Sequence, residues 1–311
     1  MDITTVCVIG GSGFIGRHVC QRLAAQGYRV RVPARDRERA KALILLPTVD
    51  VVAADIQDAG QLSQVIAGCD AVINLVGVLH DGRGNNSFTA AHVELPRKIA
   101  AACRQHGVRR LLHMSALNAD PGAASAYLRT KGEGEAIVRD SGLEVTLFRP
   151  SVVFGRGDTF LNLFAQLQRV LPVVLLASPN ARFQPVFVED VARAFVKSME
   201  NLQSVGRAYD VCGPRVYTLR ELVEFVGMTI GRPRPVIGLN DRLSYWQAFA
   251  MELLPVKLMT RDNYYSMKVD SVCNCDFPLG IRPAALEAVA PAWLRPGATP
   301  RARYQRLRAS R

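Results

Sequence analysis

The chain has no apolar run of the roughly 18 to 20 residues that a membrane-spanning helix requires. Its strongest apolar stretch, VLPVVLLA at residues 170–177, is too short. The opening MDITTVCVIGGSG lacks the basic region and the cleavable apolar core of a signal peptide. These absences predict a cytoplasmic protein.

Cysteine occurs seven times, but never in the two closely spaced pairs that typically hold zinc. The closest two, Cys273 and Cys275, form a lone C-x-C. Cys7 and Cys20 lie among apolar residues, and we expect them to be small core residues. The pattern predicts no metal site, and we expect reduced thiols, as in the cytoplasm.

Acidic residues are scarce: 27 Asp and Glu stand against 39 Lys and Arg, which gives a net charge of +12. Six of the arginines lie in RPGATPRARYQRLRASR at 295–311, which contains no acid. Such a tail can contact nucleic acid, anionic lipid or an acidic partner, but a solvated terminus is the simpler interpretation. Aromatic residues are only 7% and no motif that reads nucleic acid is present, so we expect no specific nucleic-acid partner.

The first two thirds of the chain alternate between short β-rich runs and longer segments with helical spacing. Nearly continuous apolar strands separated by helices predict an α/β fold with a doubly wound, Rossmann-type parallel sheet. The predicted strands are Thr5–Ile9, Arg29–Pro33, Val49–Ala53, Ala71–Val76, Arg110–Met114 and Val145–Arg149. The predicted helices lie near 14–26, 36–44, 60–67, 90–106 and 125–141.

The alternation weakens after Pro150, which predicts a second, smaller and mostly helical lobe. We assign 1–155 plus about 183–212 to the dinucleotide-binding domain and 156–182 plus about 213–295 to the smaller lobe, with a basic tail at 296–311. Within 241–259, four apolar residues share one helical face: Leu243, Trp246, Ala250 and Leu253. This apolar stripe predicts core or domain-interface packing more strongly than a membrane anchor.

A glycine-rich loop follows the first predicted strand and opens a helix. The stretch VIGGSGFIG carries Gly10, Gly13 and Gly16 in the spacing G-x-x-G-x-x-G. In this setting Gly10 permits a tight turn, Gly13 lets a pyrophosphate approach the backbone, and Gly16 lets the helix lie close to the sheet. The free amides at the helix N-terminus favour the phosphate charge. The predicted cofactor-binding residues of the loop are Gly10, Gly11, Ser12, Gly13, Phe14, Ile15 and Gly16.

The end of the second strand bears on the choice of cofactor. An acid is expected about 20 residues after the glycines if the cofactor is NAD, but Ala34 occupies that place and Arg35 follows. The planar guanidinium of Arg35 can pair with a 2′-phosphate. NADP(H) is therefore favoured, while NAD(H) stays open because Asp36 could bind a ribose hydroxyl.

The stretch SAYLRTKGEGEAIVRD places Tyr127 and Lys131 four residues apart, on one face of a predicted helix. A neighbouring ammonium favours the phenolate form of a tyrosine, so this pair could act as a proton donor or acceptor. Gly132 and Gly134 each weaken the helix, and they allow either close approach of a neighbouring backbone or a mobile helix start. Glu135 is expected to be a structural helix residue.

Together these motifs resemble the short-chain dehydrogenase/reductase superfamily in its extended or atypical branch, over most of the chain. VIGGSGFIG is similar to the family's glycine loop, YLRTK to its Y-x-x-x-K signature, and PVFVEDVARAF to a later strand and helix. SAYLRTKGEGEAIVRD, VVFGRGDTFLNLFA and MTRDNYYSM are similar, more narrowly, to the dehydrogenase-like accessory subunit of respiratory complex I and its bacterial relatives. That subunit family is known for tight NADPH binding, and some relatives are linked to ubiquinone metabolism.

The resemblance implies further cofactor contacts in ADIQD, VINLVG and LFRPSVVFGRGD. They are Asp55 and Ile56 near the adenine, Leu75, Val76 and Gly77 after the fourth strand, and Pro150, Ser151 and Val153 after the sixth. Lys131 would hold the nicotinamide ribose and Tyr127 would act on a carbonyl or alcohol oxygen. Ser115 would hold the substrate oxygen, although the usual double serine is Ser115–Ala116 here. His92 lies where active members often have asparagine, and a hydrogen-bonded helix residue is a simpler interpretation than a proton relay.

Three functions follow as expectations. The first is an NADP(H)-dependent oxidoreductase acting on a small apolar or carbonyl substrate, with a link to quinone or respiratory-complex biology. The second is a non-catalytic NADPH-binding accessory or assembly subunit, in peripheral contact with a membrane complex at the inner membrane. The third, a nucleotide-sugar epimerase or dehydratase, rests on the fold alone.

Overall fold

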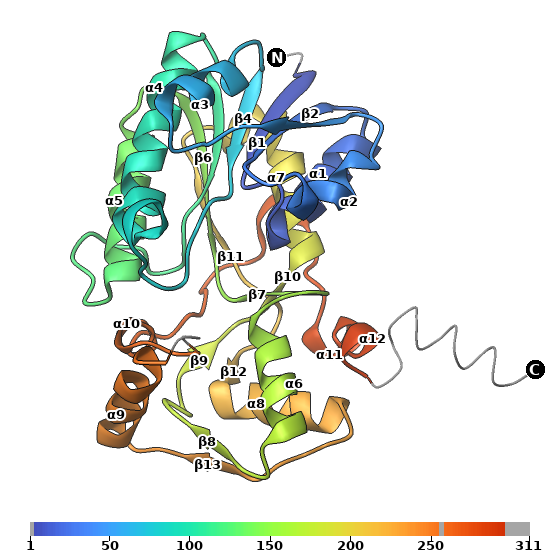
Figure 1. The fold of residues 1–311 in the computed structure, drawn as a ribbon. Helices are drawn as coiled ribbons and strands as arrows, with labels where there is room; N and C mark the ends of the chain where they lie inside the picture. Colours follow the sequence, from blue (N-terminus) through green and yellow to red (C-terminus); the bar gives the residue numbers. More distant parts are fainter. Residues whose placement is uncertain (1–2, 255–257, 296–311) are drawn as a thin grey trace, which may run out of the picture. The chain divides into compact units, whose positions relative to one another are not determined.

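The computed structural model describes residues 3–254 and 258–295 (Figure 1). The basic tail at 296–311 lies outside the described residues. The chain divides into two compact units, which are described separately. Unit 1 comprises Met1–Pro150, Val188–Val211 and Asn274–Arg282, and unit 2 comprises Ser151–Phe187, Cys212–Cys273 and Pro283–Arg311. Among the described helices, none combines the length and the apolar composition that crossing a bilayer requires.

Unit 1 is built on a seven-stranded sheet in the order β11-β6-β5-β4-β1-β2-β3, and every neighbouring pair is parallel. Strand order reverses between β1 and β4, as in a doubly wound sheet. This confirms the predicted fold class. The strands are β1 (Thr5–Ile9), β2 (Arg29–Ala34), β3 (Val49–Ala53), β4 (Ala71–Asn74), β5 (Arg110–Met114), β6 (Glu144–Pro150) and β11 (Ala208–Val211).

Two layers of helices cover this sheet (Figure 1). In one layer α1 (Phe14–Ala25) packs on α7 (Val188–Met199), and α2 (Lys41–Ile44) touches α1. In the other layer α4 (Leu95–Gln105) packs between α3 (Ala59–Ile66) and α5 (Ala126–Arg139). Both faces of the sheet are thereby buried, which explains why the strands are mostly apolar and do not alternate strictly with polar residues.

Within its described residues, unit 2 holds three two-stranded sheets and a set of helices around its own apolar core. Its sheets pair β7 (Val153–Phe154) with β10 (Val186–Phe187), β9 (Arg182–Phe183) with β12 (Tyr217–Thr218), and β8 (Val174–Leu176) with β13 (Val236–Gly238). Its helices are α6 (Phe160–Val170), α8 (Leu219–Thr229), α9 (Asp241–Glu252), α10 (Arg261–Ser266), α11 (Leu286–Val289) and α12 (Pro291–Leu294).

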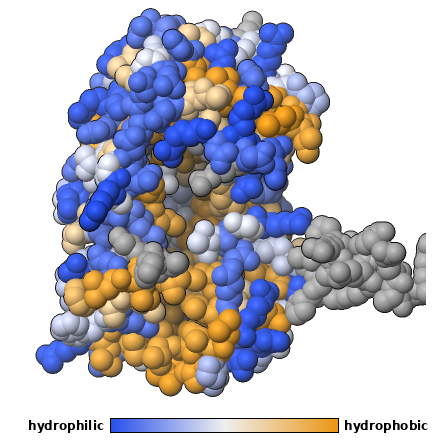
Figure 2. Space-filling view, in the orientation of Figure 1, coloured by the Kyte–Doolittle hydropathy of each residue, from blue (hydrophilic) through white to orange (hydrophobic). Residues whose placement is uncertain are grey.

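The apolar stripe is exposed, so the prediction that it packs in a core is wrong. Leu243, Trp246 and Leu253 are 52%, 62% and 72% exposed, whereas the buried residues of α9 are Ser244 and Ala248. The helical period showed which residues share a face, but it does not show which face the fold covers. In Figure 2 apolar side chains spread over the part of unit 2 built from α9, β8 and β13.

One pair of cysteines also departs from expectation. Cys212 and Cys273 form a disulfide with Cα atoms 6.0 Å apart, so the expectation that all thiols are reduced is wrong. The two residues are the first and last of one segment of unit 2 and are 61 positions apart in sequence, so no local motif predicts their pairing. Cys7 and Cys20 are buried and free, as predicted for core residues.

Candidate functional site

The glycine loop lies at the carboxyl edge of the sheet, between β1 and α1. Gly10 has a φ of 84°, and a Cβ on it would lie 3.2 Å from the backbone nitrogen of Val76. A Cβ on Gly16 would lie only 2.2 Å from the Gly10 carbonyl oxygen, so α1 begins this close to the loop because residue 16 is glycine. The N-cap residue of α1 is Gly13, which has no side chain that could cap the helix, so the first amides of α1 can receive an anion. The predicted residues Gly10–Gly16 therefore form a cradle that fits a pyrophosphate.

The end of β2 carries positive charge and no acid. Ala34 ends the strand, and the exposed Arg35 follows it. The Asp36 carboxylate accepts a hydrogen bond of 2.9 Å from the Glu38 backbone N–H, at the start of a short 3-10 turn. Asp36 is thus engaged in its own turn, whereas Arg35 extends from the edge where an adenosine ribose would lie.

The predicted contacts after β3 and β4 also lie at this edge. The Asp55 carboxylate accepts the Gln57 N–H at 3.1 Å, and Ile56 packs on the apolar core. Leu75, Val76 and Gly77 follow β4 directly. Gly10 brings the glycine loop against this segment, because its missing Cβ would stand 3.2 Å from the carbonyl carbon of Leu75.

Two buried polar groups lie near the end of β5: Ser115, which follows the strand directly, and Lys131 of α5. Lys131 is 4% exposed, and among the described residues its ammonium has one acceptor, the Met114 carbonyl oxygen at 3.2 Å. Burial lowers the pKa of Lys131 to about 8. Ser115 is 3% exposed, and within the described chain its hydroxyl has no hydrogen-bond partner. Buried donors normally find partners, so both groups have bonding capacity for a ligand.

Tyr127 lies one turn before Lys131 on α5, so the helix and the spacing are as predicted. Its ring is half-buried and meets two aromatic rings edge-on, Phe88 at 5.9 Å and His92 at 5.5 Å between centroids. These rings hold the phenol side chain on the same face as the lysine. The N-cap of α5 is Ser125, whose hydroxyl accepts the Leu128 N–H, so Ser125 has a structural role.

The glycines of α5 permit close approach and do not interrupt the helix. A Cβ on Gly132 would lie 2.6 Å from the carbonyl carbon of Asp120, and one on Gly134 would lie 1.8 Å from the His92 carbonyl oxygen. Glu135, predicted to be structural, is buried and accepts a 2.9 Å hydrogen bond from Arg149 Nε on β6. It also pairs with Arg139. The helix that carries Tyr127 and Lys131 is therefore fixed against three neighbouring segments.

One polar pair beneath this edge was not predicted from the sequence. Asn74 and His113 face each other in β4 and β5, and Asn74 Nδ2 lies 3.1 Å from His113 Nδ1. The Asn74 side-chain oxygen accepts the Val76 N–H at 3.1 Å, so the pair supports the turn after β4. Burial, and next the charge of Lys131, lower the pKa of His113 to about 3, which keeps it neutral. The available signal was one polar residue after a short apolar run near the end of each strand, AVIN in β4 and LLH in β5.

Known proteins with similar sequences and folds were compared with this chain. The sequence pattern of the NAD dependent epimerase/dehydratase family matches residues 6–212. The chain belongs to this family. It is 33% identical over 296 residues to mitochondrial NADH dehydrogenase (ubiquinone) 1 alpha subcomplex subunit 9 of Mus musculus, covering 90% of this chain and 77% of that protein. These matches confirm the resemblance to atypical short-chain dehydrogenases and to the complex I accessory subunit.

One further relative and one solved structure of similar fold extend the comparison of this epimerase/dehydratase family member. Ceramide reductase of Caulobacter vibrioides is 32% identical over 192 residues, which cover 61% of this chain and 59% of that protein. The X-ray structure of Pal from Bacillus thuringiensis superposes with a TM-score of 0.73 at 15% identity and covers 94% of this chain and 99% of that one. The latter likeness concerns the fold alone.

The last three predicted cofactor contacts lie at the end of β6 or just after it. Pro150 ends β6 in unit 1, whereas Ser151 and Val153 belong to unit 2. The Ser151 hydroxyl donates to the Ser271 carbonyl oxygen at 2.7 Å and accepts the Gln184 N–H at 3.2 Å. Ser151 is thus committed to the interior of unit 2, and Val153 pairs with Val186 in the small sheet of β7 and β10.

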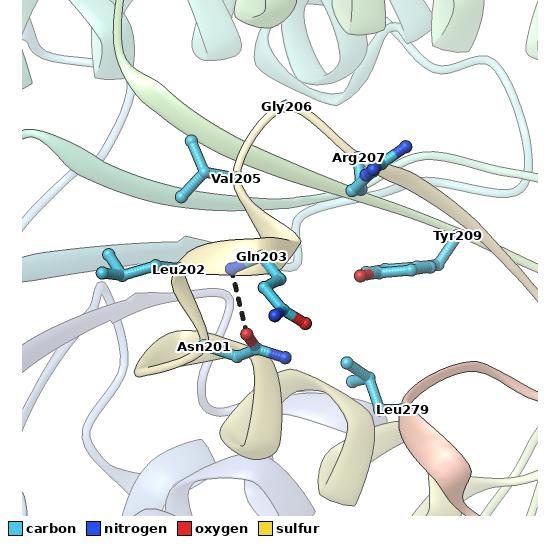
Figure 3. A pocket seen from close by; sticks show the side chains of 8 residues that line it. All are labelled: Asn201, Leu202, Gln203, Val205, Gly206, Arg207, Tyr209 and Leu279. Carbon is cyan, nitrogen blue, oxygen red and sulfur yellow. Dashed lines mark hydrogen bonds between the residues drawn. The ribbon is translucent and has the colours of Figure 1, made fainter.

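A separate open hollow of about 870 Å³ lies beside the start of β11 (Figure 3). Asn201, Gln203, Tyr209 and Leu279 face it. Because this is the amino edge of the parallel sheet, the hollow is opposite the edge that carries the glycine loop. Within residues 3–254 and 258–295, no three metal-ligating side chains lie together.

Proposed function

We propose that this family member binds NADP(H) in preference to NAD(H) and acts as an oxidoreductase on a carbonyl or alcohol group. The observation that carries the proposal is that two buried groups at this edge have few hydrogen-bond partners within the described chain: Lys131, whose ammonium lies close to Gly77 after β4, and Ser115 after β5. A bound nicotinamide would supply or accept the hydride. The chain's own contribution would be to orient it through Lys131 and to exchange a proton at the Tyr127 phenol oxygen.

The choice of NADP(H) rests on charge at the end of β2. Arg35 is exposed there, Ala34 replaces an acid, and Asp36 is engaged with Glu38. A guanidinium pairs bidentately with a phosphate, whereas a ribose hydroxyl is bound better by a carboxylate.

Arg35→Ala tests the cofactor assignment. We expect it to weaken NADPH binding by about tenfold or more and to leave NADH binding unchanged, because the lost charge meets only the 2′-phosphate. Arg29→Ala is the matched control, since Arg29 is an exposed arginine at the other end of β2. Fluorescence titration measures the dissociation constants of NADPH and NADH for wild type and both variants. If wild type and Arg35→Ala bind both nucleotides alike, the assignment is wrong.

The substrate is expected to be apolar and related to quinone or lipid chemistry. This part rests on two relatives, a subunit of an NADH dehydrogenase (ubiquinone) and a ceramide reductase. NADPH oxidation should appear with one of a panel of ketones and quinones, and Tyr127→Phe should abolish it. Turnover that survives unchanged in Tyr127→Phe would remove the tyrosine from the mechanism.

A second candidate is a non-catalytic NADPH-binding subunit at the periphery of an inner-membrane complex. The similarity to the complex I subunit favours it, and so does the exposed apolar stripe of α9. In this case NADPH should co-purify, raise the melting temperature and exchange slowly. Brisk turnover with free cofactor exchange would contradict it. An epimerase or dehydratase reaction is also compatible with the family match and would show as conversion of a nucleotide sugar.

A further inference from the structure

His92 occupies a buried position between the elements that carry the candidate site. It lies in a π-helical segment, η3 (Ala90–Glu94), which runs into α4. The side chain is 2% exposed and stacks on Phe88 with centroids 5.4 Å apart. Single turns of π-helix are uncommon and often mark functional positions.

Both nitrogens of the His92 ring are engaged. Nε2 accepts the Val78 backbone N–H at 3.1 Å, and Nδ1 lies 3.0 Å from Thr130 Oγ1. The Thr130 hydroxyl donates to the Ala126 carbonyl oxygen at 2.8 Å, so it accepts from the ring. The bonds therefore require the neutral imidazole with its proton on Nδ1. Burial, and next the charge of Lys131, lower the pKa of His92 to about 2, which is consistent with that form.

The two partners of His92 flank the residues expected to hold the nicotinamide end of the cofactor. Val78 follows Gly77, where a Cβ would lie 3.1 Å from Lys131 Nζ. Thr130 directly precedes Lys131 on α5. The imidazole thus joins the segment after β4 to the helix that carries the lysine. Since both nitrogens are bonded, His92 has no site left to relay a proton.

We propose that His92 is a positioning residue that fixes the segment Leu75–Val78 against α5. In this role it touches neither cofactor nor substrate, and it keeps Gly77 and Lys131 at the spacing that the nicotinamide ribose needs. The inference rests on the proposed binding of NADP(H). The proposed function concerns binding of the whole dinucleotide, whereas His92 is inferred to affect binding of the nicotinamide half only.

The experiment compares two ligands, NADPH and adenosine 2′,5′-bisphosphate, which lacks the nicotinamide half. His92→Phe keeps the ring packing and removes both hydrogen bonds. We expect NADPH to bind about tenfold more weakly to this variant, while the adenosine fragment binds as it does to wild type. A merely structural defect would weaken both ligands equally, and that result would overturn the inference.

Two further variants keep the test decisive if His92→Phe does not fold. His92→Gln can place an acceptor near the Nε2 position, so it should recover NADPH binding to within about threefold of wild type. Thr130→Val removes the bond at Nδ1, together with the bond of the Thr130 hydroxyl to the Ala126 carbonyl, and keeps the bond at Nε2. It should weaken NADPH binding by less than about tenfold and leave binding of the adenosine fragment unchanged. His106→Asn, at an exposed histidine of unit 1, is the control and should change neither ligand.

The outcomes separate this inference from the proposed function. If wild type binds neither ligand, both are overturned. If wild type binds both and His92→Phe leaves NADPH binding unchanged, only the positioning role is overturned. A wild-type His92 that shows the Nε2–H tautomer by nitrogen-15 NMR would also overturn it.

Discussion

At the residue scale, Lys131 shows how the candidate site conflicts with stability. A buried ammonium with one carbonyl acceptor has lost most of its hydration, and its pKa falls to about 8 for that reason. In the unfolded chain the lysine keeps a pKa near 10.4, so burying the charged ammonium lowers the free energy of unfolding. This loss has its full size below pH 8 and shrinks as the pH rises to about 10.4. The charge of Lys131 therefore destabilises the cofactor-free protein.

Lys131→Met should raise the stability of the cofactor-free protein and weaken NADPH binding. At pH 7 the gain in unfolding free energy should be about 3 kcal/mol, and it should shrink as pH rises from 8 towards 10. Urea unfolding across this pH range measures the first effect, and fluorescence titration measures the second. Lys41→Met, at an exposed lysine, is the control and should change neither. A destabilised Lys131→Met with intact NADPH affinity would contradict this account.

At the element scale, the approach of α5 to η3 depends on a missing side chain. A Cβ on Gly134 would stand 1.8 Å from the His92 carbonyl oxygen, far inside van der Waals contact. Glycine is unfavourable inside a helix, so its presence here is explained by contact between elements and not by local preference.

Gly134→Ala should destabilise the protein by about 2–4 kcal/mol, although alanine is the better helix former. The new methyl group must push α5 away from η3, so NADPH binding should weaken as well. Gly60→Ala is the comparison, because Gly60 is an exposed glycine in the first turn of α3. It should be neutral or stabilising by up to about 1 kcal/mol. Equal stability of the two variants in thermal unfolding would show that the helices do not approach so closely.

At the scale of the whole molecule, the disulfide closes one of the three segments of unit 2, Cys212–Cys273, into a covalent loop. Cys212 and Cys273 are 61 residues apart, and a loop of that length stabilises the folded state by about 4 kcal/mol in the chain-entropy model. Reduction should therefore lower the melting temperature of the purified protein. The Cys212→Ser/Cys273→Ser double variant should be equally destabilised and insensitive to reductant.

Thiol counting checks the same prediction directly. The denatured, non-reduced protein should titrate five thiols, the free residues being Cys7, Cys20, Cys69, Cys103 and Cys275. Cys275→Ser is the control and should keep its response to reductant. Seven reactive thiols before any reduction would show that the bond is not formed.

Sequence alone predicted the strands of the sheet well, because buried parallel strands are apolar and are punctuated by turns. Thr5–Ile9, Val49–Ala53 and Arg110–Met114 were predicted with their observed bounds. The glycine loop could be predicted equally well, because the residues that form it are adjacent in the sequence. The roles assigned to Ser115, Tyr127, Lys131 and the cofactor contacts stay predictions.

Features that depend on packing between distant segments could not be predicted from the sequence. The bonds of His92 to Val78 and Thr130, and the pairing of Asn74 with His113, exist only once β4, β5 and α5 are assembled. The exposure of Trp246 likewise depends on which face of α9 the rest of unit 2 covers.

The order of strands has a consequence for the chain as it is synthesised. Six strands of the sheet lie before Ser151, but the seventh, β11, begins only at Ala208, after a long excursion into unit 2. Until β11 leaves the ribosome, the outer edge of β6 has no neighbouring strand. Its free amides and carbonyls can then pair with any other strand. The nascent protein therefore passes through a stage with an open sheet edge, which ends when Val211 emerges.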